Sequence, residues 1–444
     1  MRPSVALTLL VLLAPTALAA SQVHVTYLGE TYAVTFVSNA TERVPVTWPD
    51  GETLATRVEA PSGDDDPLWR ADLPAQALSY TVEGRTFTLP EPPLVNGSTR
   101  IVYVADIGVD ANARRVIRSI AHAAPDLILI GGDLSYADGD PRIWDRWFEL
   151  MEPLAANIPV MPAYGNHEDY CTRNDRIHHC GPEANGWHAH FPLPNGEKLY
   201  YAFDWGPVRV TVLDTEAYAA GDPFTDKREQ EAFLDESLEA DEDRWDIVMY
   251  HRPLRTTNAR PNMASPEARE ALEPLLLGRA PLVLQAHLHA YERSHPLNNT
   301  TFLTSGGGGR VLYENWSEEE PWVAKRASEF HYVLIEATPT RLNITAIRPD
   351  NSTLDSFTLE RPLPPGLEPP RPTTPTPTPS VPPTSPTPTP THTPTRAPTP
   401  TPSPPVDNGS GEPPNESSPT PGVGALGLVA AAAVAARLAR RVRP

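Results

Sequence analysis

The chain has 444 residues, a length that allows about two or three domains. Its formal net charge of −20 at pH 7 argues against non-specific binding to nucleic acid, so we expect no nucleic-acid partner. A large share of its 54 prolines follows Arg361, which indicates that the folded part ends near residue 362.

Residues 1–20 have the pattern of a secretory signal peptide. Arg2 supplies a positive charge, residues 5–13 form an apolar stretch too short to span a membrane, and Ala17-Leu18-Ala19 fits a cleavage site with small residues at its first and third positions. The alternative is a buried helix of a cytosolic domain. Export would make the protein a candidate glycoprotein, because Asn-X-Ser/Thr triplets are glycosylated in secreted proteins. Such triplets begin at Asn39, Asn96, Asn299, Asn315, Asn343 and Asn351.

Residues 21–96 are predicted to form a small β-sandwich domain. Residues 22–27 and 32–37 are rich in β-branched and aromatic side chains, as strands are. Residues 79–89 form a predicted hairpin with a Glu-Gly turn. The prolines of residues 90–93 then mark a domain boundary.

Residues 97–362 alternate apolar strands with helical patterns, which is typical of an α/β domain. The predicted helices are 111–123, 141–155, 227–238 and 266–277. Three further strands have no helix between them and are predicted at 331–336, 341–347 and 355–359. We therefore expect an α/β sheet with an added antiparallel part.

Residues 363–421 form a predicted Thr/Pro-rich stalk, and residues 422–444 form a predicted anchoring tail. The stalk cannot bury apolar surface, so we expect a disordered, extended segment. The tail has an apolar stretch followed by arginines, and it resembles the C-terminal sorting tails of prokaryotic surface proteins. The alternative is a marginal membrane helix. Either interpretation predicts an extracellular, cell-surface protein that meets the membrane or envelope only through this tail.

Five predicted strands each end in side chains that can bind metals. Because open α/β sheets gather functional groups outside the carboxyl ends of their strands, we expect one shared metal site. The five endings are Asp106-Ile107-Gly108, Gly132-Asp133-Leu134-Ser135-Tyr136, Gly165-Asn166-His167-Glu168, His251-Arg252-Pro253 and His287-Leu288-His289.

The donor types of these endings suit two different metal ions. The phenol of Tyr136 favours Fe(III), because a hard anionic oxygen stabilises the higher charge. Asp133 stands between the other donors in chain order and could bridge two ions. His287 and His289 are two residues apart, so an extended segment directs both imidazoles to one side.

Cys171 and Cys180 are the only two cysteines, and they follow the third motif closely. We expect a disulfide that pins the loop between them beside the site. The alternative is a pair of thiol metal ligands, but two cysteines without a second pair make a poor zinc signature.

These motifs resemble those of the purple acid phosphatases, a family of calcineurin-like metallophosphoesterases. The likeness covers about residues 22–360 and includes Asp-X-Gly, Gly-Asp-X-X-Tyr, Gly-Asn-His-Glu, Val-X-X-His and Gly-His-X-His, the last with alanine in place of glycine. It implies an α/β metallophosphoesterase sandwich of two mixed β-sheets flanked by helices, preceded by a small all-β fibronectin-III-like domain. It implies Fe(III) ligands at Asp106, Asp133, Tyr136 and His289. It implies ligands to a divalent Fe, Zn or Mn ion at Asp133, Asn166, His251 and His287.

The resemblance also implies an activity, that of an acid phosphatase acting on a small phosphate ester. Metal-bound hydroxide would attack a phosphate monoester, and His167 would face the substrate and protonate its leaving group. One alternative is a phosphodiesterase or nucleotidase on the same site. The other is a surface binding or adhesion module whose metals are structural. The oligomeric state is left open.

Two regions depart from the family pattern. Ala286 replaces the glycine before the fifth motif. Arg260 and Pro261 occupy the region where the family often has a second substrate-facing histidine. Arg260 is predicted to hold the phosphate electrostatically, although it cannot donate its proton. His178 and His179, in the loop closed by the cysteines, are candidate replacements, and the alternative is that they are simply exposed.

Overall fold

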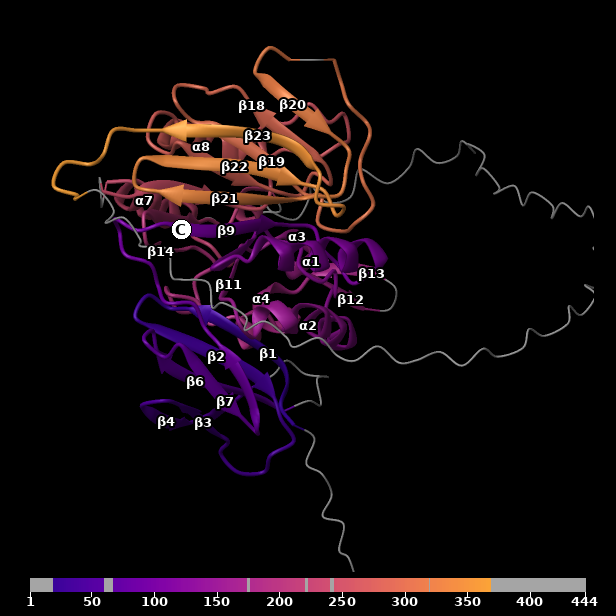
Figure 1. Cartoon of the computed structure of the whole chain (residues 1–444). Coiled ribbons are helices and arrows are strands. Elements are labelled where there is room, and N and C mark those ends of the chain that lie inside the picture. Colours follow the sequence, from indigo (N-terminus) through magenta and orange to yellow (C-terminus); the bar gives the residue numbers. More distant parts are fainter. Residues whose placement is uncertain are drawn as a thin grey trace, which may run out of the picture. The chain divides into compact units, whose positions relative to one another are not determined.

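The structure is a computed structural model (Figure 1) that describes residues 19–59, 67–173, 176–219, 223–239, 243–318 and 320–368. The described residues all belong to one compact unit. Most of the predicted signal peptide, the stalk beyond residue 368 and the whole tail lie outside the described residues, so those assignments stay predictions. Within the described part, no helix is long and apolar enough to cross a membrane.

Among the described residues of the N-terminal region, the regular elements are all strands, as expected, and they form two antiparallel four-stranded sheets (indigo in Figure 1). One sheet contains, in order, β1 (Ser21–Tyr27), β2 (Thr31–Val37), β6 (Leu68–Pro74) and β5 (Thr56–Val58). The other contains β4 (Gly51–Leu54), β3 (Pro45–Trp48), β7 (Ser79–Val82) and β8 (Arg85–Thr88). The fibronectin-III-like assignment stays a prediction.

Strand β1 is buried along almost its whole length because both of its faces are covered. On one side it packs against α2 (Pro141–Ala155), where the His24 and Phe148 rings stack with centroids 4.3 Å apart. The Gln22 amide donates to Asp145 at 2.9 Å. The two predicted domains therefore share one hydrophobic core.

The larger part of the chain contains two mixed sheets. The first contains β11 (Val160–Pro162), β10 (Leu127–Ile130), β9 (Thr99–Val104), β21 (Tyr332–Thr338), β22 (Arg341–Ile347) and β23 (Thr353–Glu360). Its β9, β10 and β11 are parallel, and β21, β22 and β23 form the expected antiparallel addition. The second contains β14 (Tyr201–Trp205), β15 (Val208–Val212), β16 (Trp245–Met249), β17 (Leu282–Gln285), β19 (Thr301–Ser305), β18 (Tyr291–Ser294) and β20 (Val323–Ala327).

Tyrosine hydroxyls connect the two sheets across the core. Tyr103 of β9 donates to the carbonyl of Gln285 at the end of β17, at 2.8 Å. Tyr201 of β14 donates to the carbonyl of Pro162 at the end of β11, also at 2.8 Å. Both bonds lie at the ends of strands, so they help to fix the distance between the loops that carry the candidate ligands.

Helices flank both sheets. Helices α1 (Ala111–Ala123) and α2 have the predicted bounds, and each starts after an aspartate whose side chain accepts backbone N–H groups of the first turn. Helices α7 (Lys227–Ser237) and α8 (Pro266–Leu276) are one residue shorter than predicted. The aromatic side chains Trp144, Trp147 and Phe148 of α2 are buried and so face the core. Short helices and a hairpin complete the chain: α3 (Asn166–Asp169), β12 (Tyr170–Arg173), β13 (Arg176–His179), α4 (Gly181–Asn185), α5 (Trp187–His190) and α6 (Glu216–Ala219).

Candidate metal centre

The seven predicted ligands lie in the loops that follow the carboxyl ends of five strands. In four of these loops the first ligand comes two or three residues after the strand, and in the fifth it is the first residue of α3. The first ligands, after β9, β10, β11, β16 and β17, are Asp106, Asp133, Asn166, His251 and His287. Parallel strands bring these ends to one edge of each sheet, which is why the motifs converge.

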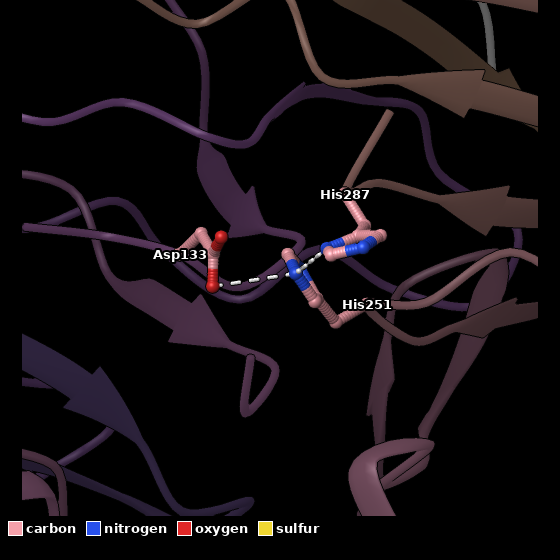
Figure 2. Close-up of side chains that lie close together, drawn as sticks. All are labelled: Asp133, His251 and His287. Carbon is pink, nitrogen blue, oxygen red and sulfur yellow. Dashed lines mark hydrogen bonds and ion pairs between the residues drawn. The ribbon is translucent and has the colours of Figure 1, made fainter. Parts of the chain in front are cut away.

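One group of donors surrounds the Nε2 atom of His251 (Figure 2). The Oδ1 atom of Asp133 lies 3.3 Å from it, and the Oδ1 atom of Asn166 lies 3.2 Å away. The Nδ1 atom of His287 also lies 3.2 Å away. These four residues are the predicted ligands of the divalent ion.

A second group of donors surrounds the hydroxyl of Tyr136. The Oδ1 atom of Asp106 lies 3.2 Å from this hydroxyl, and the Nε2 atom of His289 lies 2.9 Å from it. The carboxylate of Asp133 has an oxygen within 4.8 Å of the donors of both Asp106 and His289. Asp133 therefore belongs to both groups, as a bridging ligand must.

The orientation of two histidines fits metal ions. The Nδ1 atom of His251 lies 2.8 Å from the carbonyl oxygen of Gly131, and that of His289 lies 2.8 Å from the carbonyl of Val311. A carbonyl only accepts, so Nδ1 carries the proton in each ring. In the neutral imidazole Nε2 then presents a lone pair to neighbouring oxygen atoms, an arrangement that a cation stabilises.

The electrostatics of the site favour positive charge at the same place. Burial by itself lowers the pKa of His251, but the charge of Asp133 raises it to about 10. Burial likewise opposes ionisation of Asp133, and the charges of His251 and His167 hold its pKa well below the usual value. A metal ion at Nε2 of His251 would supply the positive charge in place of a proton.

Four of the ligands have left-handed backbone, a conformation that side chains disfavour. The φ angles are +57° at Asp106, +52° at Asp133, +59° at Tyr136 and +64° at His287. Each such residue costs about 1–3 kcal/mol, and such residues cluster at functional sites. The surrounding loops therefore hold these four ligands in place against a local conformational cost.

Comparison with known proteins agrees with this geometry. Residues 99–291 match the family described as Calcineurin-like phosphoesterase. The chain carries a calcineurin-like phosphoesterase domain. Purple acid phosphatase 23 of Arabidopsis thaliana is 28% identical over 309 residues, which are 59% of this chain and 61% of that protein. Purple acid phosphatase 18 of the same plant is 30% identical over 267 residues, 56% of this chain and 59% of that protein.

A solved structure supports the same fold. The purple acid phosphatase PPD1 from seeds of yellow lupin (Lupinus luteus) superposes with a TM-score of 0.64 at 21% identity, over 77% of this chain and 74% of that chain. The predicted resemblance to purple acid phosphatases and the α/β fold with mixed sheets are thus confirmed. This chain covers about three-fifths of the length of the two Arabidopsis relatives.

Glu168 joins two ligand loops of the phosphoesterase domain. Its buried carboxylate accepts the backbone N–H groups of Asp133 at 2.7 Å, Leu134 at 2.9 Å and Gly165 at 3.1 Å. Burial and then the charge of Asp133 raise the pKa of Glu168 to about 8. The acid of the Gly-Asn-His-Glu motif therefore positions the bridging ligand rather than binding a metal itself.

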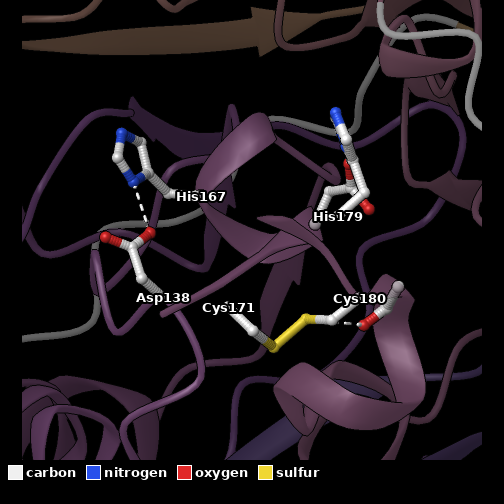
Figure 3. The surroundings of a disulfide bond; sticks show 7 residues. Asp138, His167, Cys171, His179 and Cys180 are labelled. Atoms are coloured by element: carbon white, nitrogen blue, oxygen red, sulfur yellow. Dashed lines mark hydrogen bonds and ion pairs between the residues drawn. A yellow bond between two sulfur atoms is a disulfide. The ribbon is translucent and has the colours of Figure 1, made fainter. Parts of the chain in front are cut away.

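His167 projects beside the metal donors. Its orientation is fixed by Asp138, which is not one of the predicted site residues. Its Nδ1 atom lies 2.7 Å from Oδ1 of Asp138 (Figure 3), and its Nε2 atom lies 4.0 Å from Oδ2 of Asp133. Its ring also packs against Tyr136, with centroids 4.1 Å apart. Asp138 lies in the same loop as Asp133 and Tyr136. Its position two residues after Tyr136 is the sequence signal that could have predicted a role for it at the site.

Arg260 is exposed and its guanidinium lies over the ring of Tyr313, 3.8 Å from the centroid. Tyr313 in turn stacks on the ligand His289, with centroids 4.1 Å apart and an interplanar angle of 15°. The role of Arg260 in holding phosphate stays a prediction. Arg310 lies over the ring of the ligand Tyr136, 4.3 Å from the centroid. The structure thus places Arg310 against a predicted iron ligand, whereas Arg260 lies against a tyrosine that stacks on one.

Tyr313 and Arg310 were missed in the sequence, although the glycine run at 306–309 is a signal. A Cβ atom at Gly306 would lie 2.5 Å from Oδ2 of Asp106 and 2.2 Å from the carbonyl of Leu288. The chain must therefore lack side chains to pass this close to two ligand loops, and it emerges at Arg310.

The predicted disulfide is present in the structure, where Cys171 and Cys180 are bonded with their Cα atoms 5.7 Å apart (Figure 3). It closes the antiparallel pair β12 and β13. His178 and His179 both lie on β13, but they differ in their contacts. Both side chains are exposed, but Nδ1 of His179 pairs with the buried carboxylate of Asp169.

Proposed function

We propose that this chain is a binuclear metal phosphatase that hydrolyses phosphate monoesters, with the activity of an acid phosphatase. The single observation that carries the proposal is the pair of donor groups that share Asp133. A structural site needs neither two ions of different preference nor an amide ligand such as Asn166. The curated relatives are purple acid phosphatases, which supports a phosphoester hydrolase.

We propose Fe(III) in the group that contains the phenol and a divalent Fe, Zn or Mn ion in the other. When bound, the two cations neutralise the phosphate dianion and activate the attacking water. The Fe(III) ligands would be Asp106, Asp133, Tyr136 and His289. The ligands of the divalent ion would be Asp133, Asn166, His251 and His287.

The proton for the leaving group comes from His167 in this proposal. Burial lowers its pKa, but the charge of Asp133 and the hydrogen bond that the ring donates to Asp138 outweigh burial and raise it above the ordinary value. The raised pKa widens the pH range over which the ring keeps its proton. Asp138 holds Nδ1, so the proton on Nε2 is the one presented to the ester oxygen. General acid catalysis of this kind contributes about 100- to 10,000-fold.

A substrate panel with metal analysis tests the function and its two alternatives. Purified protein should contain two metal ions per chain, and it should hydrolyse phosphate monoesters faster than the diesters of the same alcohols. Faster hydrolysis of the diesters, or action on nucleotides alone, would instead make the protein a phosphodiesterase or nucleotidase. Bound metals with no hydrolysis of any ester would favour a surface binding module.

We also propose that the protein is exported and attached to the cell surface. The support is the sequence: a signal-like N-terminus, a Thr/Pro-rich stalk and an apolar tail with arginines. In this arrangement residues 21–96 form a fibronectin-III-like domain and residues 97–362 the catalytic domain. The partner is then a small phosphate ester outside the cell, and the membrane or envelope is met only through the tail.

A further inference from the structure

The hairpin closed by the disulfide carries a second histidine–carboxylate pair, which the proposed chemistry does not use. His179 directs Nδ1 to Asp169, just as His167 directs Nδ1 to Asp138 (Figure 3). The ring of Tyr170 contacts both histidines, with centroids 5.8 Å from His167 and 5.2 Å from His179. The two imidazoles are therefore neighbours of the same aromatic ring.

The pair of His179 and Asp169 has a fixed geometry because the carboxylate of Asp169 has few other partners. Asp169 is 1% exposed, and its Oδ1 atom has no hydrogen-bond partner among the described residues. A buried carboxylate is costly unless it is paired. His179 supplies that partner through Nδ1, so the free ring nitrogen, Nε2, faces away from Asp169. Cys180 follows His179 directly, and the disulfide holds the end of the strand in place.

His179 lines a cavity of about 560 Å³ beside the metal centre. The cavity meets the centre at Arg252, whose Nη1 atom lies 2.7 Å from Nε2 of the ligand His287. Its walls are mostly polar. The other polar residues that line it include Tyr170, Tyr218, Asn262, Ser265 and Glu267.

We propose that this cavity binds the alcohol part of the substrate and that Nε2 of His179 makes a hydrogen bond to one of its hydroxyl groups. The preferred esters are then phosphates of sugars or small polyols. The volume lies in the range of small-molecule sites, and carboxylate, amide and imidazole groups match a ligand that both donates and accepts hydrogen bonds. This inference rests on the proposed function, because it assumes that a phosphate ester is bound at the adjacent metals.

Matched variants of two neighbouring residues test the proposal. His179→Ala should raise KM for glucose 6-phosphate and glycerol phosphate by about 3- to 10-fold, the loss expected for one hydrogen bond. It should leave kcat for every ester and KM for p-nitrophenyl phosphate unchanged, because that aryl group has no hydroxyl to bind. His179→Gln keeps a hydrogen-bonding side chain and should recover part of the loss. His178→Ala, one position away on the same strand, should change nothing.

The outcomes separate this proposal from the proposed function. If His179→Ala and His178→Ala behave alike, or if His179→Ala affects the aryl and polyol esters equally with both metals retained, the cavity is not the alcohol site. Should His179→Ala fold poorly, the His179→Gln protein decides instead. The quantity compared is then its KM for the polyol esters divided by its KM for p-nitrophenyl phosphate. A wild-type protein that hydrolyses no ester at all would refute the phosphatase function instead.

Discussion

Tyr136 lies between Asp106 and His289, and its protonation state distinguishes iron from the other metals. Burial, and then the charge of Asp106, raise the pKa of Tyr136 well above its usual value. The phenol therefore ionises only next to a strongly charged cation, which is a reason to expect a trivalent ion there.

The first prediction concerns the colour that follows from this ligand. The wild-type protein should be pink to purple from phenolate-to-iron charge transfer, and Tyr136→Phe should lose the visible band while remaining folded. Visible spectra and metal analysis check this, and Tyr313→Phe is the matched control, because Tyr313 stacks on His289 and is not a predicted ligand. A colourless, active wild-type protein without iron would show that the assignment is wrong.

The second prediction concerns proton donation by His167. His167→Ala should keep both metals but slow alkyl phosphates by about 100-fold or more, because a poor leaving group needs the proton. Aryl phosphates with acidic phenols should lose much less. Asp138→Asn keeps the imidazole but weakens its orientation, so it should give a smaller loss with the same contrast. Equal losses for alkyl and aryl esters, with metals retained, would make His167 a binding residue.

At the scale of elements, strand β16 leads into a candidate metal ligand and also carries a carboxyl group whose ionisation is costly. His251 follows its C-terminal end, and Asp246 lies within it, partly buried. Burial raises the pKa of Asp246 from 3.8 to about 7, although Arg209, Arg361 and Arg279 act in the opposite direction. The folded state therefore binds this proton more tightly than the unfolded state does.

The third prediction is a pH-dependent gain in stability. The pKa of Asp246 is raised in the folded state. The protonated carboxyl therefore contributes stability that is fully present below about pH 4, and this stability is lost as pH rises through 7. Asp246→Asn cannot ionise, so it should stabilise the fold by about 1–3 kcal/mol at pH 8 and by much less at pH 4. Denaturant unfolding at both pH values measures this, with the exposed Asp72→Asn on β6 as control. A gain of the same size at both pH values would rule out ionisation as the cause.

At the scale of the whole molecule, the described fold ends with contacts made by Arg361. Its guanidinium donates to the carbonyls of Pro339 at 2.8 Å and Asp243 at 2.6 Å, and it lies over the ring of Trp245. The end of β23 is thereby tied to the second sheet. All seven candidate ligands precede this point in the chain.

The fourth prediction concerns where the chain can be cut. A protein ending at Glu368 should fold, be secreted and keep full activity, because the stalk and tail carry no ligand. A protein ending at Glu360 lacks Arg361 and should lose about 1–3 kcal/mol of stability, the cost of charged hydrogen bonds. Thermal unfolding and ester hydrolysis compare the two. Loss of soluble activity in the longer protein would contradict the stalk assignment.

The sequence by itself determined the strands that precede the ligand motifs, the four long helices and the seven candidate ligands. Those inferences depend on local signals. Aspartates at positions 110 and 140 cap helices by bonds to the next residues, and each ligand motif directly follows its own strand. The β-branched and aromatic residues of β1 are likewise a local signal of a strand.

Only the tertiary structure decided which neighbours these residues have. His178 and His179 are adjacent in sequence, yet only His179 meets a buried carboxylate, because the hairpin turns one side chain toward the domain. Arg310 reaches Tyr136 from a segment far away in the chain, and Tyr313 reaches His289 in the same way. Such contacts depend on how loops from two stacked sheets approach one another, and no local pattern of side chains encodes that distance.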